Sequence, residues 1–396
     1  VVSQLGTLPA LALPSIEVLL LLLLAYIVLI GPVNYLVLRR LDRREWAWIT
    51  MPLLVVGFAA VAFAVGATLR GTEVIVNQIA LVRAAPGTDA AQAQVYLGVF
   101  SPVARGSYEV SIAGGALLSA PYGGEGFGQA GTQGLDVVQG DPARVRALEV
   151  GFGNLRAVRA EAPVTAPRIE ASLRLEGGRV VGAIRNASDV VLETPAVVLG
   201  TGVVVLGDLA PGATADVNLE ATPDAFGRAL SERIFGQQQW PVDGSTSPSF
   251  LRDQVRRQLV DALTYDPFFG STGTLPADGP VLLAWGKPGL LPVLVSGSEP
   301  RTAGETLFYL PLDLAAQGRV AFTPDLVRST VVENAAQSFG KDPFNITIGG
   351  GSVTLAYRPI PVTGTFGVTR LAIGVNMGVV GPLGANGAGP GTTVEP

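Results

Sequence analysis

Residues 168–220 read RIEASLRLEGGRVVGAIRNASDVVLETPAVVLGTGVVVLGDLAPGATADVNLE. Short runs rich in valine, leucine and isoleucine alternate there with turn-forming residues such as Gly177-Gly178 and Ala210-Pro211-Gly212. About six strands spaced by roughly 8 to 12 residues are typical of a small antiparallel sandwich. We therefore expect residues 166–221 to form an immunoglobulin-like or jelly-roll-like β-sandwich.

The sequence on either side of this module also favours β structure. Residues 71–165 contain runs such as TEVIVNQIALVR, which predict a second β-domain upstream. Residues 266–396 contain FNITIGGGSVTLAYRPIP and GVTRLAIGVNM, which predict a β-rich C-terminal domain. No evident closing strand follows these runs, so we expect that domain to be truncated.

Residues 222–265 interrupt the β pattern and predict a helical insertion. Thr222-Pro223 and Ser247-Pro248 each supply an N-cap residue followed by a first-turn proline. The apolar stripe of the second helix consists of Leu251, Val255, Leu259 and Leu263. Arg252, Arg256 and Arg257 lie off this stripe, so we expect them to face solvent.

Near the N-terminus, two apolar runs are long enough to cross a membrane. Residues 18–38 carry no formal charge and span roughly 30 Å at about 1.5 Å per residue. Residues 46–69 form a second run of similar length. Residues 18–70 are therefore expected to form an α-helical transmembrane hairpin with its turn at residues 39–45.

The charges of the turn predict the orientation of the hairpin. The turn carries Arg39, Arg40, Arg43 and Arg44. Arginine costs about 2.5 to 3.5 kcal/mol at the bilayer centre, and short positively charged loops stay in the cytoplasm. We therefore expect residues 1–17 and everything after residue 70 to be exoplasmic, with Trp46 and Trp48 as anchors at the membrane interface.

Two features of the spans are candidates for helix packing. Asn34 is a polar residue within the first span, where its amide is expected to hydrogen-bond a neighbouring helix. The small residues of the second span recur every three to four positions and permit close approach of another helix. They are Gly57, Ala60, Ala64 and Ala67.

The composition excludes several classes of function. Cysteine and histidine are both absent, so the chain has no disulfide, no thiolate metal site and no histidine-based catalysis. The net charge is −5, and no basic patch is interleaved with aromatic residues, so we expect no nucleic-acid partner. We expect no catalytic residue, no cofactor and no metal site, with a carboxylate-dependent hydrolase as the remaining enzymatic alternative.

Two short motifs are expected to be incidental. Gly126, Gly128 and Gly131 match G-x-G-x-x-G, but no predicted strand precedes them and no helix follows, as dinucleotide binding requires. Asn186-Ala187-Ser188 matches a glycosylation sequon, and we interpret it as a simple turn.

A family resemblance rests on the hairpin and its surroundings. GPVNYLVLRRLDRREWAWITMP at residues 31–52 is followed by VIVNQIALVR, GVFSP and GAIRNASDVVLETPAVVLG. This set resembles a family of uncharacterised bacterial membrane proteins that carry such a hairpin beside large exoplasmic β-domains, over residues 14–300. Longer relatives have another exoplasmic domain before the first span, so we expect this chain to be a processed product or a fragment.

These observations favour a non-enzymatic protein anchored in the bacterial cytoplasmic membrane. Its exoplasmic β-domains are expected to bind a protein or an envelope polymer, in a scaffold or adhesion role. The expected partners are the lipid bilayer and a protein of the membrane or envelope. One alternative is an accessory subunit of a membrane transport or respiratory complex, and another is a carbohydrate-binding or carbohydrate-active envelope protein.

Overall fold

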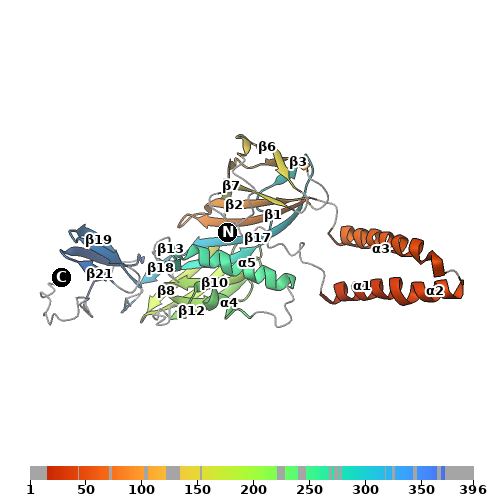
Figure 1. Cartoon of the computed structure of the whole chain (residues 1–396). Helices are drawn as coiled ribbons and strands as arrows, with labels where there is room; N and C mark the ends of the chain where they lie inside the picture. Colours follow the sequence, from red (N-terminus) through yellow and green to blue (C-terminus); the bar gives the residue numbers. More distant parts are fainter. Residues whose placement is uncertain are drawn as a thin grey trace. The chain divides into compact units, whose positions relative to one another are not determined.

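The computed structural model shows a mainly β protein with a pair of apolar helices at its N-terminus, as the sequence predicts (Figure 1). It describes residues 16–42, 44–70, 74–101, 106–121, 134–151, 154–220, 228–239, 247–266, 270–271, 275, 279–316, 318–322, 326–341, 346–363 and 367–370. The predicted exoplasmic segment 1–17 lies outside these residues except for its last two. The chain divides into two compact units, residues 1–363 and 364–396.

The N-terminal helices form an antiparallel hairpin, which we call the apolar hairpin. It comprises α1 (Ile16–Val28), a π-turn (Leu29–Val33), α2 (Asn34–Arg40), a 3₁₀ turn (Arg44–Trp46) and α3 (Ala47–Arg70). Two stretches, Leu20–Arg40 and Ala47–Ala64, are long and apolar enough to cross a membrane, with mean hydropathy 2.3 and 2.1. Pro32 lies within the π-turn, because proline has no N–H for the regular helical ladder.

The centre of the β-rich part is an eight-stranded sheet with the order β11-β10-β15-β17-β1-β2-β7-β4. Its strands are β1 (Ile75–Ala84), β2 (Ala90–Phe100), β4 (Leu117–Ser119), β7 (Leu155–Thr165), β10 (Glu193–Leu199), β11 (Gly202–Val205), β15 (Val281–Gly286) and β17 (Arg301–Pro311). Neighbouring strands are antiparallel except β1 and β17, which pair in parallel from Ile75 with Arg301 to Arg83 with Tyr309. Strands β1 and β17, which are far apart in the sequence, therefore lie side by side in the middle of one sheet.

Two four-stranded sheets cover one face of this central sheet. The first has the order β12-β9-β8-β18 and the second β16-β3-β6-β5. Their strands are β3 (Gly106–Ile112), β5 (Asp136–Val138), β6 (Ala143–Val150), β8 (Ile169–Glu176), β9 (Arg179–Asn186), β12 (Thr214–Glu220), β16 (Val293–Val295) and β18 (Leu314–Ala316). Valine and leucine from all three sheets share one core, which includes Val95, Val145 and Leu175.

Two helices cover the opposite face of the central sheet, α4 (Leu230–Phe235) and α5 (Pro248–Leu263). Helix α5 begins as predicted, because Pro248 occupies its first turn and the Ser247 hydroxyl accepts a hydrogen bond from the Phe250 amide at 3.2 Å. Thr222-Pro223 lies outside the described residues. Helix α4 takes its caps from α5, since Asp261 accepts from the Ser231 amide at 3.2 Å and Arg257 donates to the Phe235 carbonyl at 2.9 Å.

The predicted module at residues 166–221 does not close on itself. It contributes five strands, of which β8, β9 and β12 form part of one layer, while β10 and β11 belong to the central sheet. Strand β10 pairs there with β15, so one sheet crosses the predicted boundaries at residues 165, 221 and 265. Strand spacing along the sequence reveals neighbouring strands, but it carries no information on a partner such as β15, whose paired residues lie 83 to 92 positions after those of β10.

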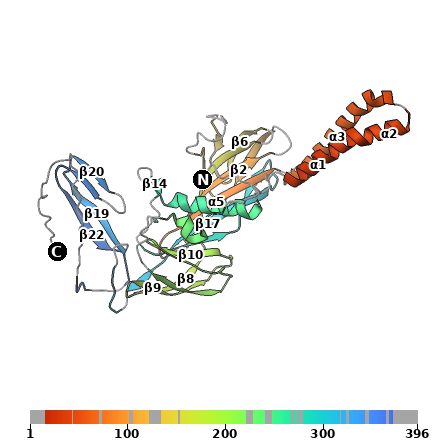
Figure 2. The same cartoon turned by 60° about the horizontal axis from the view of Figure 1, so that its bottom comes forward.

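Residues 327–359 form a separate antiparallel hairpin, which we call the β-arm (Figure 2). It comprises β19 (Val327–Asn334), β20 (Ser338–Lys341), β21 (Ile346–Gly349) and β22 (Val353–Pro359). Backbone hydrogen bonds from Ala335 to Ser352 and from Gln337 to Gly350 join the two ladders. The predicted strand at residues 367–377 lies mostly outside the described residues.

Candidate functional site

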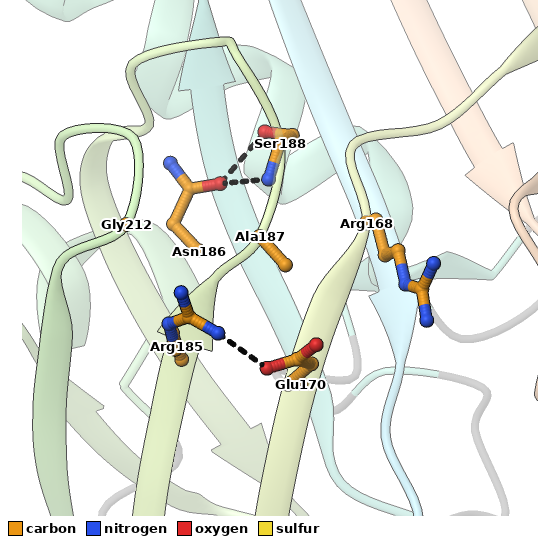
Figure 3. A pocket seen from close by; sticks show the side chains of 7 residues that line it. All are labelled: Arg168, Glu170, Arg185, Asn186, Ala187, Ser188 and Gly212. Carbon is orange, nitrogen blue, oxygen red and sulfur yellow. Dashed lines mark hydrogen bonds and ion pairs between the residues drawn. The ribbon is translucent and has the colours of Figure 1, made fainter.

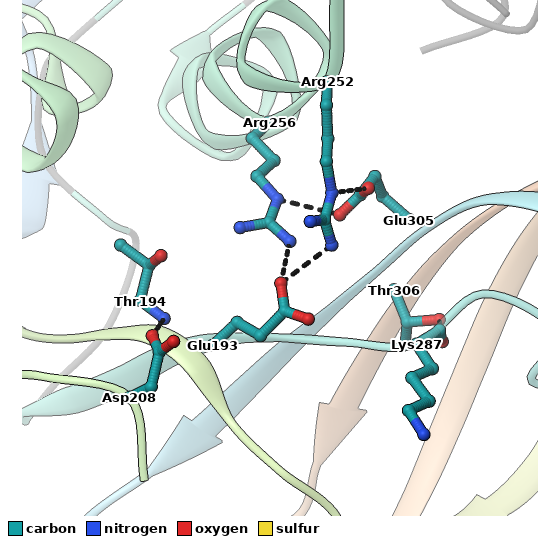
Figure 4. Close-up of polar contacts among 8 residues, drawn as sticks. All are labelled: Glu193, Thr194, Asp208, Arg252, Arg256, Lys287, Glu305 and Thr306. Atoms are coloured by element: carbon teal, nitrogen blue, oxygen red, sulfur yellow. Dashed lines mark hydrogen bonds and ion pairs between the residues drawn. The ribbon is translucent and has the colours of Figure 1, made fainter. Parts of the chain in front are cut away.

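A cluster of four charged side chains lies between α5 and the central sheet, and we call it the charged cluster (Figure 4). Arg252 and Arg256 come from consecutive turns of α5, Glu193 from β10 and Glu305 from β17. Each arginine contacts both glutamates, at 2.7 Å from Arg252 to Glu193 and 2.8 Å from Arg256 to Glu305. The cluster is electrically balanced, with two positive and two negative charges.

The deep half of the charged cluster is nearly free of solvent. Arg256 and Glu305 are each 5% exposed, and the Arg256 guanidinium also lies over the Trp285 ring at 5.0 Å from its centroid. This corrects the sequence expectation that Arg256 faces solvent. Arg256 lies beside the predicted apolar stripe, and its long side chain reaches a carboxylate on a strand that the sequence pattern does not place nearby.

The electrostatics of the charged cluster indicate a structural anchor. Burial raises the pKa of Glu193, but hydrogen bonds and charge from Arg256 and Arg252 outweigh it and hold that pKa below its ordinary value. Burial likewise lowers the pKa of Arg252, and its contacts with Glu305 and Glu193 outweigh this and raise it. A general acid needs a raised carboxyl pKa, so the shift at Glu193 has the wrong sign for that role.

The sequon residues Asn186, Ala187 and Ser188 line a shallow pocket of about 330 Å³ (Figure 3). Asn186 itself is fully buried, and its amide nitrogen donates to the carbonyls of Val190 and Leu209 at 2.8 and 2.9 Å. Its amide oxygen accepts from the Ser188 amide and hydroxyl. An amide with both N–H groups engaged in the interior is closed to an oligosaccharide, and the interpretation as a turn agrees with this geometry.

The rest of this pocket offers little for a ligand. Arg185 and Glu170 on its wall pair with each other at 2.9 Å, and both are exposed. The same pattern continues over the outer face of β8, β9 and β12, where Arg174 pairs with Glu176 and Arg179 with Glu220. This face is a solvated surface whose charges neutralise one another.

The β-arm is the clearest candidate for an interaction surface. Opposite residues on β19 and β22 share a face, and successive residues alternate between the faces. One face carries Val327, Ser329, Val331, Leu355, Tyr357 and Pro359, and the other carries Arg328, Thr330, Ala356 and Arg358. We call the first set the apolar arm face; Val332, in the bulge after Val331, adjoins it.

The apolar arm face is open to solvent. Val331, Val332 and Tyr357 are 42%, 66% and 62% exposed, and no described side chain between residues 327 and 359 is buried. Isolated two-stranded hairpins are marginally stable, and large exposed apolar patches mark contact surfaces. Sequence reasoning recognised the strands and missed this surface, although the alternation Val353, Leu355, Tyr357 in the sequence contains the signal.

The structure places most of the predicted residues of the apolar hairpin. Arg39 and Arg40 end α2 and are exposed, whereas Arg43 and the side chain of Arg44 lie outside the described residues. Trp46 and Trp48 are exposed at the start of the second helix. The remaining predicted residues, which concern helix packing, separate into two groups.

Asn34 faces inward and the small residues of α3 face outward. Asn34 is only 7% exposed, although it is polar, because α2 and α3 enclose it. Gly57, Ala60 and Ala64 are exposed, and a Cβ built on Gly57 meets nothing within 4 Å. The side chain of Ala67 is outside the description. The hairpin therefore does not use Gly57, Ala60 or Ala64 to hold its own two helices together.

No group of three or more aspartate and glutamate side chains within the described ranges is placed to hold a metal ion. G-x-G-x-x-G at residues 126–131 lies outside those ranges.

Part of the chain matches a known family. The family described as "Domain of unknown function (DUF8725)" matches residues 168–315, from β8 to β18. That stretch contains Asn186, α4, α5 and the charged cluster, and it leaves out the apolar hairpin and the β-arm. An uncharacterised family agrees with the resemblance noted in the sequence, and the hairpin motif lies outside the match.

No curated protein matches the chain. Among solved structures, the yeast delta-COP-I mu-homology domain is similar with a TM-score of 0.31 and 5% identity, covering 62% of this chain and 98% of that chain. The same domain complexed with a Dsl1 WxWxV peptide gives a TM-score of 0.30 at the same identity and coverage. Similarity at this level supports no statement about the function of this chain.

Proposed function

We propose that this protein is a non-enzymatic, membrane-anchored protein of the bacterial envelope whose exoplasmic β-rich part binds another protein. The observation that carries the membrane anchor is the apolar hairpin. The stretches Leu20–Arg40 and Ala47–Ala64 are strongly apolar, yet almost none of either stretch is buried in the protein. Such a surface is unfavourable in water and ordinary in lipid.

The charges at the turn favour one orientation. Arg39 and Arg40 are exposed at the end of α2, beside Arg43 and Arg44 in the sequence. Short arginine-rich loops stay in the cytoplasm, which puts the β-rich part on the exoplasmic side of the cytoplasmic membrane.

The apolar arm face supports a protein partner over a polysaccharide. Its exposed apolar members are the valine and tyrosine side chains of Val331, Val332 and Tyr357, which gain by burial against another apolar surface. A polysaccharide presents hydroxyl groups, which need hydrogen-bonding side chains, and the face offers only Ser329 and the Tyr357 hydroxyl. The proposed role is that of a scaffold docked through the β-arm.

The anchor is tested by single-cysteine labelling, because the natural chain has no cysteine. Asp42→Cys lies in the turn and Thr88→Cys in an exposed loop between β1 and β2. With a membrane-impermeant maleimide on spheroplasts, Thr88→Cys should react at once and Asp42→Cys only after lysis. Equal labelling would reject the orientation, and release of the chain by alkaline carbonate would reject the anchor.

The partner is tested by mild detergent extraction from the native membrane with mass spectrometry of co-eluting proteins. Val331→Glu places a charge on the apolar arm face, and Thr330→Glu places the same charge on the opposite face. A stoichiometric partner should be lost with Val331→Glu and kept with Thr330→Glu. Elution of the unaltered chain alone, or equal loss with both variants, would contradict docking through the β-arm.

A second candidate function is an accessory subunit of a larger membrane complex. The observation in its favour is that Gly57, Ala60 and Ala64 lie on the exposed side of α3, where a partner helix can approach closely. For this candidate, Ala60→Leu should remove the partner while Val331→Glu leaves it bound. The opposite outcome favours the β-arm.

A further inference from the structure

The two helices of the apolar hairpin meet along one narrow seam. Among the described side chains of residues 20–42 and 45–64, the buried or half-buried ones follow each other mainly at intervals of four. They are Leu22, Tyr26, Ile30, Asn34 and Leu38 on the first side, and Ala47, Thr50, Leu54, Phe58 and Ala62 on the second. All other described side chains in those stretches are exposed, so these positions define the contact.

The register of the seam follows from one ring contact. Tyr26 and Phe58 contact each other across the hairpin with ring centroids 5.0 Å apart and ring planes tilted by 53°. Because the helices are antiparallel, a step of four residues forward on the first corresponds to four backward on the second. Two such steps from Tyr26 and Phe58 bring Asn34 opposite Thr50.

This layer is the polar exception in an apolar seam. Asn34 is 7% exposed. The Thr50 hydroxyl oxygen has no solvent access and no hydrogen-bond partner within the described part of the chain. A buried hydroxyl without a partner is costly, and in hydrocarbon no water is present to satisfy it. The Asn34 amide is the polar group at the same level of the seam and is the natural partner of the Thr50 hydroxyl.

The π-turn explains why Asn34 points into the seam. The turn Leu29–Val33 directly precedes Asn34, whose backbone N–H bonds to the carbonyls of Gly31 and Leu29. A π-turn holds more residues per turn than an α-helix, so it shifts the direction in which the later side chains point. With this shift, Asn34 and Leu38 lie on the same side of the helix as Tyr26 and Ile30.

We propose that Asn34 and Thr50 form a side-chain hydrogen bond across the apolar hairpin within the membrane, and that this bond fixes the register of the two helices. The Asn34 amide and the Thr50 hydroxyl each offer a donor and an acceptor, so the bond can form with either side chain donating. Asn34 is thus a positioning residue of the membrane anchor. The inference rests on the membrane location proposed above.

The test measures how strongly the hairpin closes, using a reporter disulfide in the full chain in lipid vesicles. Leu22→Cys and Ala62→Cys form a facing pair of the seam at its open end, and the chain has no other thiol. Equilibration with glutathione redox buffers gives the effective concentration of one thiol at the other. Leu21→Cys with Val61→Cys has the same residue spacing but lies on exposed positions, and serves as the matched control.

Asn34→Leu and Thr50→Val should each lower the effective concentration of the reporter pair about threefold to tenfold. The double variant should be no lower than either single variant, and Thr50→Ser should behave as the natural chain. Equal effective concentrations for the natural chain and all variants would overturn the hydrogen bond. So would a double variant whose decrease is the product of the decreases of the two single variants.

Carbonate extraction of the same vesicles separates the two proposals. A chain that stays in the membrane but shows no coupling overturns the hydrogen bond alone. A chain released from the membrane overturns the anchor and, with it, this inference.

Discussion

Replacing Arg256 with methionine tests whether the charged cluster anchors α5 to the central sheet. Methionine keeps most of the aliphatic stem over Trp285 while it removes the charge. The change breaks the contacts of Arg256 with both glutamates and leaves Glu305, which is 5% exposed, with Arg252 as its one charged partner in the cluster. Breaking a buried ion pair from one side costs about 3 to 5 kcal/mol. Because Arg252 keeps one contact with each glutamate, we expect the lower end, about 3 kcal/mol.

The assay is denaturant unfolding of the detergent-solubilised chain, followed by tryptophan fluorescence. Trp46, Trp48 and Trp240 are replaced with phenylalanine, so that Trp285 beneath Arg256 is the sole reporter. Arg179→Met is the matched control, because its contact with Glu220 is exposed and such pairs contribute about 0 to 1 kcal/mol.

Two outcomes decide this prediction. If Arg256→Met destabilises the Trp285 region no more than Arg179→Met does, the cluster is not an anchor. Adding Glu305→Gln to Arg256→Met removes the excess negative charge, so the double variant should be more stable than the sum of the two single effects. Simple additivity would show that the two side chains do not act as a pair.

Three further predictions concern single residues. The pKa of Glu193 is lower in the folded state than its ordinary value of 4.5, so the ionised Glu193 stabilises the fold at pH values above 4.5. This stabilisation is lost as the pH falls through the pKa of the folded state. The free energy of unfolding measured against pH should therefore decrease in acid, and Glu193→Gln should make this decrease smaller. Asn186→Ala removes the side-chain hydrogen bonds of a fully buried amide and should cost about 1 to 3 kcal/mol, and in a glycosylating host the natural Asn186 should stay unmodified by peptide mass spectrometry. Gly304→Ala should abolish protease resistance, because its Cβ would lie 1.9 Å from the Gln78 carbonyl oxygen at a φ of +126°, whereas Gly207→Ala, with nothing within 4 Å, should not.

The elements that depend on neighbouring residues were predictable from the sequence. Continuous apolarity predicts the apolar hairpin, short β-branched runs predict most strands, and Ser247-Pro248 predicts the start of α5. Each of these signals acts within about one turn or one strand, so it can be read without knowledge of the fold.

The long-range pairings were not predictable from such signals. The partners of Arg256 lie 49 and 63 residues away on two different strands, and no local pattern connects them. For the same reason the central sheet was divided among predicted domains, although β1 and β17 pair over nine consecutive positions. The amphipathic β-arm is different, because its alternation is local and the signal was present.

The parallel pairing of β1 with β17 has a consequence for biogenesis. Strand β1 is the first strand synthesised after the apolar hairpin, but its parallel partner β17 ends only at Pro311. Until that point β1, β2 and β7 have been synthesised, but β1 has an open hydrogen-bonding edge, and such edges promote aggregation. Non-local pairing also slows folding. The β-rich part therefore completes its central sheet only after most of the chain has emerged, and the edge of β1 is open to pairing with other chains during that interval.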